Sequence, residues 1–317
     1  MKSFIINEND AGQRVDRFIE KSVPLLPKGL MQKYIRLKRI KRNGKRTAPA
    51  DRLMAGDELQ LYINDEFFSD TKSQKLDFLQ AEKLTGIIYE DENIILVNKP
   101  AGLIVHENDK IKGDTLIDRI LRYLYEKKEY DPARENSFTP ALCNRIDQYT
   151  QGLIIAAKNA AALRILNQKL KDREIKKFYL CLVHGKPRSS RETLHGWLTK
   201  DGASNTVEVS TKPINGAKEI TTAYKVIKSG QKYSLLEIDL LTGRSHQIRA
   251  HLSSIGCPIC GDSKYGADSI GKLPGMYHQA LCAYKLEFAF TEDAGPLNYL
   301  NGKVFELNDI PFVNLVK

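Results

Sequence analysis

Three separated segments of the chain gather side chains that can exchange protons or pair with anions. They span residues 97–108, 144–158 and 241–266, and apolar runs typical of strands lie next to them. An ionised carboxylate such as that of Asp147 can act as a general base or a nucleophile at neutral pH. Because enzymes often place such groups on loops at the ends of rigid elements, the pattern predicts a catalytic cleft lined by these segments.

Each segment presents its polar side chains around a turn. In the first, Lys99 and His106 flank a Pro-Ala-Gly turn, and in the second, Arg145 and Asp147 come directly before a turn and a buried strand. In the third, a strand and a turn at Gly243 lead into a predicted helix with four basic side chains: Arg244, His246, Arg249 and His251.

The elements that must position these loops are mostly strands. Apolar patterns predict strands near 86–89, 94–97, 153–157, 177–183, 222–227, 233–240 and 280–290. Helical spacing of apolar residues predicts helices over 114–127 and 161–171. Since strands outnumber helices, we expect an α+β fold with a mixed, mainly antiparallel sheet.

Length and composition are those of a globular protein with a substantial core. The chain has 317 residues, of which 42% are hydrophobic and 28% charged, with a formal net charge of +10. This composition argues against global disorder, and the length predicts either one large domain or a large domain with a small one. The positive charge favours a polyanionic partner.

The basic residues are concentrated near the N-terminus. Residues 1–63 hold 14 Lys and Arg against seven Asp and Glu, and residues 28–46 hold nine basic residues and no acid. Such a stretch is typical of a surface that binds a phosphate backbone, the alternative being a solvated basic face. The predicted RNA contacts here are Lys33, Arg36, Lys38, Arg39, Lys41, Arg42, Lys45 and Arg46.

The sequence pattern divides the chain into two folded units. Apolar residues at helical spacing over 15–23 and 30–37, followed by an Asn43-Gly44 hairpin signal, predict a small unit of two helices and a hairpin. Residues 66–83 are mostly polar, as in a linker. We therefore predict a small basic α+β domain over 1–65, a linker over 66–83 and a catalytic domain over 84–317.

The cysteine pattern and the N-terminal sequence are not those of a secreted protein. The five cysteines are scattered and odd in number, so we expect no disulfide framework. Cys257 and Cys260 form a CxxC pair without a second such pair, and we predict neither a metal nor a redox site. No secretory signal or run of about 18 apolar residues is evident. We expect a cytoplasmic monomer that does not contact membranes.

The three segments resemble the signature motifs of the RluA family of RNA pseudouridine synthases, over about residues 86–290. The first is similar to N-K-P-x-G-L-x-V-H, and the third to L-T-G-R-T-H-Q-I-R-x-H with Ser245 in place of Thr. The central segment is similar to H-R-L-D-x-x-T-S-G, with four positions in register: Arg145, Asp147, Thr150 and Gly152. Three ordered motifs of this length are a specific signal.

The resemblance implies an isomerase that turns uridine into pseudouridine in RNA without a cofactor. It assigns Asp147 as the nucleophile or base, Arg249 as the cation that keeps this carboxylate ionised, and Tyr179 as an aromatic ring that stacks on a flipped-out uracil. The residues expected to hold RNA phosphate or shape the site are Arg145, Arg244 and His246.

A second resemblance concerns the N-terminal unit. Residues 12–63 resemble the small RNA-binding module of the fourth small-subunit ribosomal protein, which often precedes this catalytic domain. Together the two resemblances imply structured RNA as the substrate, with large-subunit ribosomal RNA favoured over transfer RNA.

The central motif departs from the family pattern at three positions. Asn144 replaces His, Ile146 replaces Leu and Gln151 replaces Ser. None removes the carboxylate, and Asn can donate a hydrogen bond as His can, so we expect rewired local contacts. The main alternative is a non-catalytic RNA-binding or ribosome-assembly factor that keeps the fold. An N-glycosidase acting at C1′ is less favoured, because glycosidases usually pair two carboxylates.

Overall fold

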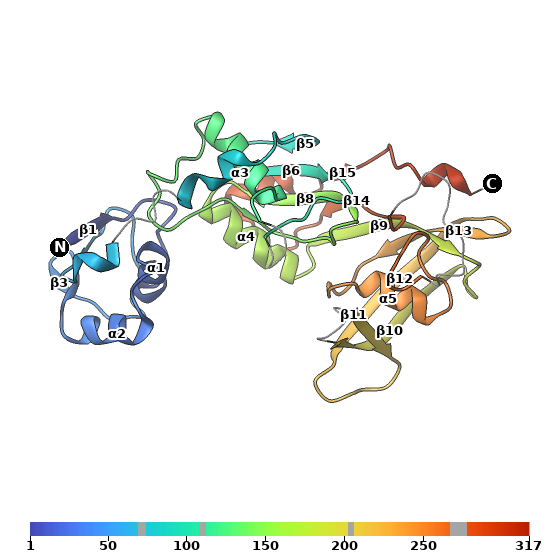
Figure 1. The fold of residues 1–317 in the computed structure, drawn as a ribbon, viewed down its shortest axis with the longest axis horizontal. Helices are drawn as coiled ribbons and strands as arrows, with labels where there is room; N and C mark the ends of the chain where they lie inside the picture. Colours follow the sequence, from blue (N-terminus) through green and yellow to red (C-terminus); the bar gives the residue numbers. More distant parts are fainter. Residues whose placement is uncertain (69–73, 108–111, 202–205, 267–277, 317) are drawn as a thin grey trace.

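The computed structural model describes residues 1–68, 74–107, 112–201, 206–266 and 278–316, and their strands form two sheets (Figure 1). A four-stranded sheet lies in residues 1–68, the N-terminal module. An 11-stranded sheet lies in the remaining residues, the larger domain. Strands outnumber helices and are mostly antiparallel, so the predicted α+β fold is confirmed.

The N-terminal module packs two helices against its sheet, whose strand order is β1-β4-β2-β3. Its elements are β1 (Lys2–Ile5), α1 (Val15–Ser22), α2 (Lys28–Arg36), β2 (Ile40–Arg42), β3 (Lys45–Arg46) and β4 (Glu58–Leu61). Phe18 of α1 is fully buried, with its ring 5.6 Å from that of Phe4. Asn43 and Gly44 have φ of 50° and 73°, as a tight hairpin turn requires. The two expected helices and the hairpin are therefore present.

The larger sheet has the order β11-β10-β12-β13-β9-β14-β8-β6-β5, with β15 beside β14 and β7 beside β8. Its strands are β5 (Ile87–Glu90), β6 (Ile94–Lys99), β7 (Ala141–Leu142), β8 (Gln151–Ala157), β9 (Ile175–His184), β10 (Arg191–Asp201), β11 (Thr206–Ser210), β12 (Lys218–Ser229), β13 (Tyr233–Asp239), β14 (Leu281–Phe288) and β15 (Val304–Glu306). β14 and β8 are parallel, and the other pairings between the described strands of this sheet are antiparallel.

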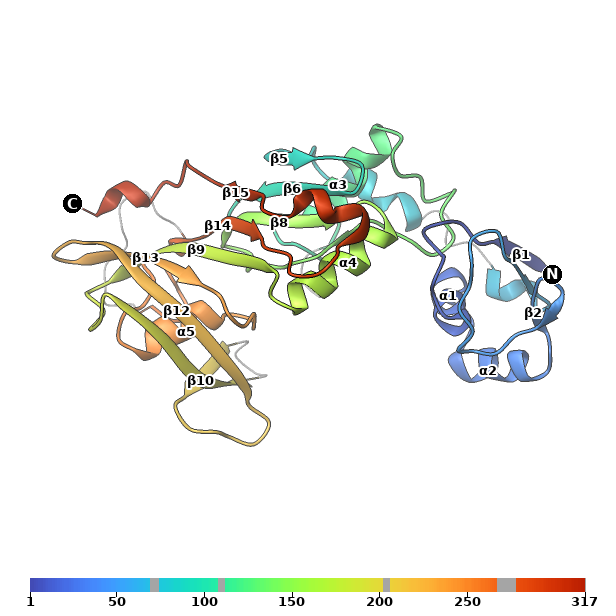
Figure 2. The same ribbon diagram turned by 180° about the vertical axis from the view of Figure 1, so that it is seen from behind.

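Three helices of the larger domain lie on two parts of this sheet (Figures 1 and 2). α3 (Leu116–Glu126) and α4 (Ala160–Lys171) lie near β6 and β8, and α5 (Gln247–Ser254) lies against the arm formed by β10 to β13. α5 begins at Gln247, so the prediction that Arg244 and His246 lie on this helix is wrong. His246 has φ of 55°, which turns the chain before the first helical residue. No helix in the described ranges is long and apolar enough to cross a bilayer.

The parallel contact between β8 and β14 depends on glycine. Gly152 lies opposite Ala283 with φ of 133°, and a Cβ atom at this position would lie 2.3 Å from the Ala283 carbonyl oxygen. Only glycine permits both the conformation and the approach. The end of the loop that carries Asp147 is thereby fixed against the middle of the sheet.

The segment predicted as a linker, 66–83, is folded where the structure describes it. Its two 3-10 helices are η1 (Asp65–Phe68) and η2 (Gln74–Gln80). Phe78 and Ala81 are buried, and the Phe78 ring lies 5.9 Å from that of Tyr125 in α3. Residues 74–83 are therefore folded onto the larger domain, and the role of 66–83 as the connection between two folded units stays a prediction. Two anchoring side chains are too few to give a periodic pattern, yet they dock this turn onto the larger domain.

Polar side chains join the N-terminal module to the larger domain. Asp10 is fully buried and accepts hydrogen bonds from Asn136 Nδ2 at 2.7 Å and Ser137 Oγ at 2.5 Å. Arg164 of α4 donates to the Ala11 carbonyl oxygen at 2.8 Å. Because a buried carboxylate is costly unless it is hydrogen-bonded, these contacts fix the module in place.

We expect Asp10→Ala to release the N-terminal module, because the lost bonds to a charged acceptor contribute about 1.5–3 kcal/mol each. Small-angle X-ray scattering should show an increased radius of gyration, with unchanged helix content by circular dichroism. Asp65→Ala is the control, since its carboxylate in the same module is 91% exposed. Scattering of Asp10→Ala identical to that of the wild type would contradict the docking role.

Candidate active site

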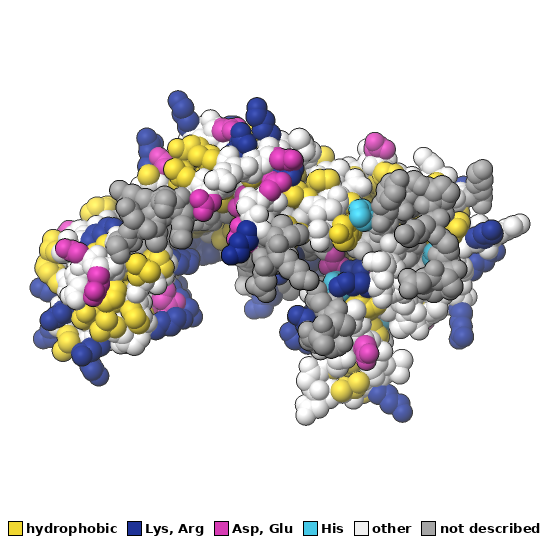
Figure 3. Space-filling view, in the orientation of Figure 1, with side chains coloured by type: hydrophobic (Ala, Val, Ile, Leu, Met, Phe, Trp, Pro, Cys, Tyr) yellow, Lys and Arg dark blue, Asp and Glu magenta, His cyan; other side chains and the backbone are white. Residues whose placement is uncertain are grey.

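Asp147 lies in the loop between β7 and β8, with Thr150 N–H donating to its carbonyl oxygen at 3.0 Å. Figure 3 shows acidic, basic and histidine side chains gathered in a notch between the middle of the molecule and the arm of β10 to β13. The Asp147 side chain is 26% exposed. One side of this carboxylate is therefore open to an incoming molecule while the other contacts protein.

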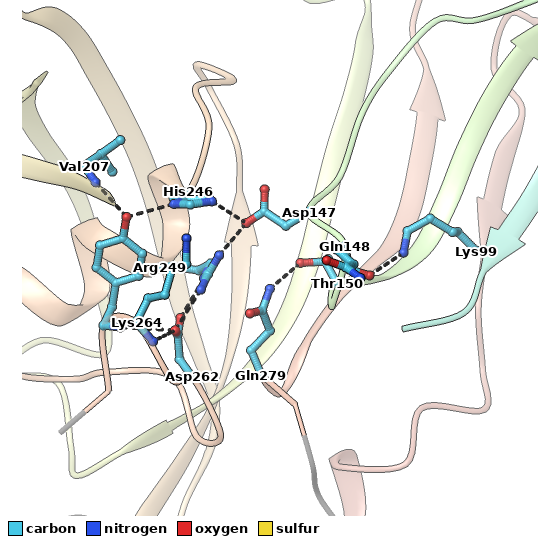
Figure 4. A network of polar contacts seen from close by, with 11 residues as sticks. Lys99, Asp147, Gln148, Thr150, Val207, His246, Arg249, Asp262, Lys264 and Gln279 are labelled. Carbon is cyan, nitrogen blue, oxygen red and sulfur yellow. Dashed lines mark hydrogen bonds and ion pairs between the residues drawn. The ribbon is translucent and has the colours of Figure 1, made fainter. Parts of the chain in front are cut away.

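The protein side of this carboxylate meets Arg249, which α5 carries. Arg249 Nη1 donates to Asp147 Oδ2 at 2.9 Å (Figure 4). The same guanidinium donates through Nε and Nη2 to both oxygens of Asp262, at 2.7 and 2.8 Å. A guanidinium held in this fork can turn very little, so the position of Asp262 sets the direction from which Arg249 reaches Asp147.

Asp262 is suited to this anchoring role because it remains ionised although it is buried. Burial opposes its ionisation, but the hydrogen bonds and charge of Arg249 outweigh this effect and lower its pKa. The backbone N–H groups of Lys264 and Tyr265 add bonds to Oδ1, at 2.9 and 3.2 Å. Sequence reasoning missed Asp262. A signal was present in the aspartate that follows the CxxC turn, but its spacing from Arg249 along the chain does not reveal their contact.

His246 lies on another side of Asp147. Its Nδ1 is 2.9 Å from Tyr265 Oη, and its Nε2 is 4.0 Å from Asp147 Oδ2. Tyr265 Oη also accepts a hydrogen bond from Val207 N–H at 2.8 Å, which anchors the pair to β11. The contact with Tyr265 holds the ring beside the carboxylate. Burial lowers the pKa of His246, and the charge of Asp147 opposes that shift.

Tyr179 lies on β9, in the middle of the sheet, and is 5% exposed. Burial raises its pKa, and the negative charge of Asp147 raises it further. The ring is therefore within electrostatic reach of the carboxylate and keeps its phenolic proton at neutral pH. Tyr179 pairs with Ala283 of β14, which lies opposite Gly152 at the end of the Asp147 loop, and Arg249 contacts Asp147 directly. The structure thus places the three residues predicted as catalytic in one region, although they come from segments far apart in the sequence.

Lys99 is a second residue that sequence reasoning left without a role. Its side chain is fully buried, and its Nζ donates to the carbonyl oxygens of Pro100, Leu103 and Gln148 at 2.7 to 2.8 Å. Burial lowers its pKa to about 7, an effect that the charge of Asp147 opposes. Lys99 therefore ties the first motif to the residue after Asp147. The available signal was a lysine at the end of an otherwise apolar strand.

The departures from the family motif are accommodated locally. Asn144 accepts a hydrogen bond from Ile155 N–H at 2.8 Å and donates to the Leu153 carbonyl oxygen at 3.2 Å. Its side-chain amide thus pairs with β8 as a peptide group would. Gln151 is half-buried at the start of β8, and its backbone pairs with Cys282. The loop carrying Asp147 is therefore held at both ends despite the replacements.

The predicted RNA contacts of the N-terminal module differ in their surroundings. Lys33, Arg36 and Arg46 line an open groove of about 360 Å³ between α2 and the residues after β3. Arg42 instead forms an ion pair with buried Asp57, at 2.7 Å, so its charge is already compensated. The other predicted contacts that are exposed are Lys38, Arg39 and Lys45, while Lys41 is half-buried.

Arg145 and Arg244 lie on the exposed surface of the loops around Asp147. Arg145 is two residues before Asp147, and Arg244 precedes α5. In the part of the chain that the structure describes, neither guanidinium forms an ion pair. Both are therefore available to an anionic ligand.

The CxxC cysteines are buried in the larger domain. Cys257 and Cys260 are free thiols, and burial raises the pKa of both, to about 12 for Cys260. A thiol with a raised pKa is a poor nucleophile at neutral pH. Among the residues described, no three His, Cys, Asp or Glu side chains are placed to hold a metal ion.

A buried polar network holds α5, and with it Arg249, against β12. His251 Nδ1 lies 3.0 Å from Thr222 Oγ1, to which Gln247 Nε2 also donates at 2.9 Å. Gln247 accepts from Thr242 Oγ1 at 2.9 Å. His251 is 2% exposed, and burial lowers its pKa to about 4. The network therefore depends on a neutral His251.

This pKa predicts a pH-dependent stability. Between the folded value of about 4 and the ordinary value of 6.5, the unfolded chain binds more protons at His251 than the folded chain. The free energy of unfolding should fall by about 2 kcal/mol from this group as the pH drops from 7 to 5. In denaturant titrations at pH 7 and pH 5, this fall in the free energy of unfolding should be smaller by about 2 kcal/mol in His251→Gln than in the wild type. Equal falls in the two proteins would contradict the assignment.

The family model and the similar proteins found by comparison agree on one protein family. A family model described as RNA pseudouridylate synthase matches residues 93–254. A protein of Mycoplasma capricolum, named an uncharacterized RNA pseudouridine synthase, is 32% identical over 97% of this chain and 98% of its own length. A ribosomal large subunit pseudouridine synthase C of Rickettsia bellii is 34% identical over 81% of this chain and 84% of its own length.

A solved structure agrees at the level of the fold. Human RNA pseudouridylate synthase domain containing 1 is 23% identical, with a TM-score of 0.57 over 74% of this chain and 87% of its own length. The family match and the coverage of the relatives lead to one assignment: this chain belongs to the RNA pseudouridylate synthase family, isomerases that convert uridine in RNA to pseudouridine.

Proposed function

We propose that this protein converts uridine to pseudouridine in large-subunit ribosomal RNA, with Asp147 acting at the ribose of a flipped-out nucleotide. The observation that carries the proposal is the bridge from Asp147 through Arg249 to Asp262. The Rickettsia bellii relative is named for the large ribosomal subunit, which supports ribosomal over transfer RNA. The basic groove of the N-terminal module provides a second RNA contact.

The reaction needs one anionic group at the sugar and a surface for the base. The bond between N1 and C1′ breaks, uracil turns, C5 bonds to C1′, and the proton on C5 is lost while N1 gains one. An ionised Asp147 can attack C1′ or remove a proton at the ribose. Arg249 pairs with this carboxylate and fixes its direction. Tyr179 is 5% exposed, so it offers a protonated phenol on the sheet side of the site rather than an open aromatic face for the everted base.

The surroundings of Asp262 argue against a glycosidase. Asp262 is 5% exposed, and both of its oxygens accept hydrogen bonds from Arg249. It is therefore committed as an anchor and is unavailable as the second carboxylate that glycosidases use. The intact pair of Asp147 and Arg249 also argues against a decayed site in a protein that only binds RNA.

We expect Asp147→Asn to abolish pseudouridine formation, with a loss of at least about 10²–10⁴-fold, because the amide cannot act as nucleophile or base. Unmodified ribosomal and transfer RNA would each be incubated with the protein, and pseudouridines mapped by chemical adduct sequencing. RNA affinity should stay within about twofold, since Asn preserves the shape of Asp.

The control is Asp172→Asn, because Asp172 is an exposed carboxylate at the end of α4. Product in transfer RNA alone would contradict the proposed substrate. Undiminished product from Asp147→Asn would contradict the role of Asp147. Absence of product from the wild type, while a known synthase is active in parallel, would favour the non-catalytic alternative.

Asp262→Asn should lower kcat by about 10- to 100-fold with little change in KM, because a neutral amide cannot hold the guanidinium of Arg249 in a charged fork. The measurement is single-turnover and steady-state pseudouridine formation on the RNA identified above. Asp262→Glu should recover part of the rate. An unchanged kcat in Asp262→Asn would show that Arg249 needs no anchor.

A further inference from the structure

An exposed aromatic pair lies beside the catalytic loop and has no part in the reaction described above. The rings of Tyr149 and His278 are stacked, with centroids 4.2 Å apart and 20° between their planes. Tyr149 is 40% exposed, and His278 is exposed as well. Two aromatic rings stacked at the surface present a flat apolar face to solvent beside the site.

The pair is fixed to the loop that carries Asp147. Tyr149 is the second residue after Asp147, and its neighbour Thr150 accepts a hydrogen bond from Gln279 Nε2 at 2.8 Å. Gln279 directly follows His278, so this bond joins the two segments that supply the rings. A Cβ atom on Gly261 would lie 2.4 Å from the His278 carbonyl oxygen. The pair therefore lies between the loop of Asp147 and the turn that leads into Asp262.

The charges on the loops that flank Asp147 fit a nucleic-acid strand. Arg145 is exposed on the same loop as Tyr149, Arg244 is exposed on the loop before α5, and no ion pair engages either guanidinium within the described ranges. A flat aromatic surface beside unpaired cations is the combination that binds single-stranded RNA, since bases stack on the rings while the cations hold phosphates. An acidic or purely apolar ligand would use only one of these features.

We propose that the Tyr149–His278 stack is a binding site for the base of the nucleotide next to the flipped uridine. The inference rests on the proposed function and adds a second base contact to it. When a nucleotide leaves the RNA stack, its neighbour loses an aromatic partner. The rings of Tyr149 and His278 replace that partner, and the RNA bases around the target are held open while the reaction proceeds.

The test compares two probes by fluorescence anisotropy at low salt. One is a fluorescein-labelled oligouridine of ten nucleotides, and the other is a ribose-phosphate oligomer of the same length without bases. Tyr149→Ala should bind oligouridine about tenfold more weakly than the wild type, within the range expected for one stacked base, and bind the base-free oligomer equally well. Tyr149→Phe keeps the ring and should match the wild type. Tyr299→Ala is the control, because Tyr299 is 41% exposed and its hydroxyl contacts Asp91 and Asn93, in the turn between β5 and β6.

Several results would overturn the site. The first two are equal affinity of the wild type and Tyr149→Ala for oligouridine, and a loss of affinity in Tyr149→Ala that is the same for both probes. The other two are a loss of affinity in Tyr149→Phe as large as in Tyr149→Ala, and no binding of oligouridine by the wild type. Pseudouridine mapping with the same preparations separates this inference from the proposed function. If Tyr149 contributes to binding of oligouridine but not of the base-free oligomer, and no pseudouridine forms, the stacking site is upheld and the proposed function is rejected. If pseudouridine forms but Tyr149→Ala binds oligouridine as the wild type does, the function is upheld and the stacking site is rejected.

Discussion

The site depends on one guanidinium that bridges two carboxylates. Arg249 contacts Asp147, which is open on one side, and Asp262, which is buried and accepts four hydrogen bonds from Arg249 and its own turn. An ion pair at a solvent-exposed surface would contribute little, but here one partner is fixed inside the protein. The open carboxylate is consequently held in one direction, as attack at a sugar carbon or removal of a proton requires.

The fold is arranged so that this bridge forms between distant segments. Gly152 lets β8 approach β14 closely, which fixes the end of the Asp147 loop in the middle of the sheet. Lys99 fixes the same loop from the other side through the Gln148 carbonyl oxygen. α5 brings Arg249 from the arm of β10 to β13. The two halves of the large sheet therefore each contribute to the surroundings of Asp147: one half fixes the loop that carries it, and the other supplies Arg249.

Sequence patterns predicted the parts that depend on local chemistry. The α+β class, α3, α4 and β8, the strand that follows the Asp147 loop, follow from periodicity, and the three motifs gave the family, whereas the two-residue strand β7 was not predicted. Asp262 was not found and Lys99 was named without a role, because each acts through a contact that the fold creates: Asp262 with Arg249, and Lys99 with the Gln148 carbonyl oxygen. The packing of Phe78 onto α3 could not be predicted for the same reason, since a single buried ring leaves no repeat in the sequence.

The account is tested most directly by the structure of the protein bound to RNA that carries 5-fluorouridine at the modified position, where fluorine replaces the proton that must leave C5. It predicts an everted nucleotide with an Asp147 oxygen about 3–3.5 Å from C1′ or bonded to it, and Arg249 still bridging to Asp262. An everted nucleotide whose ribose lies away from Asp147, with another side chain at C1′, would contradict it.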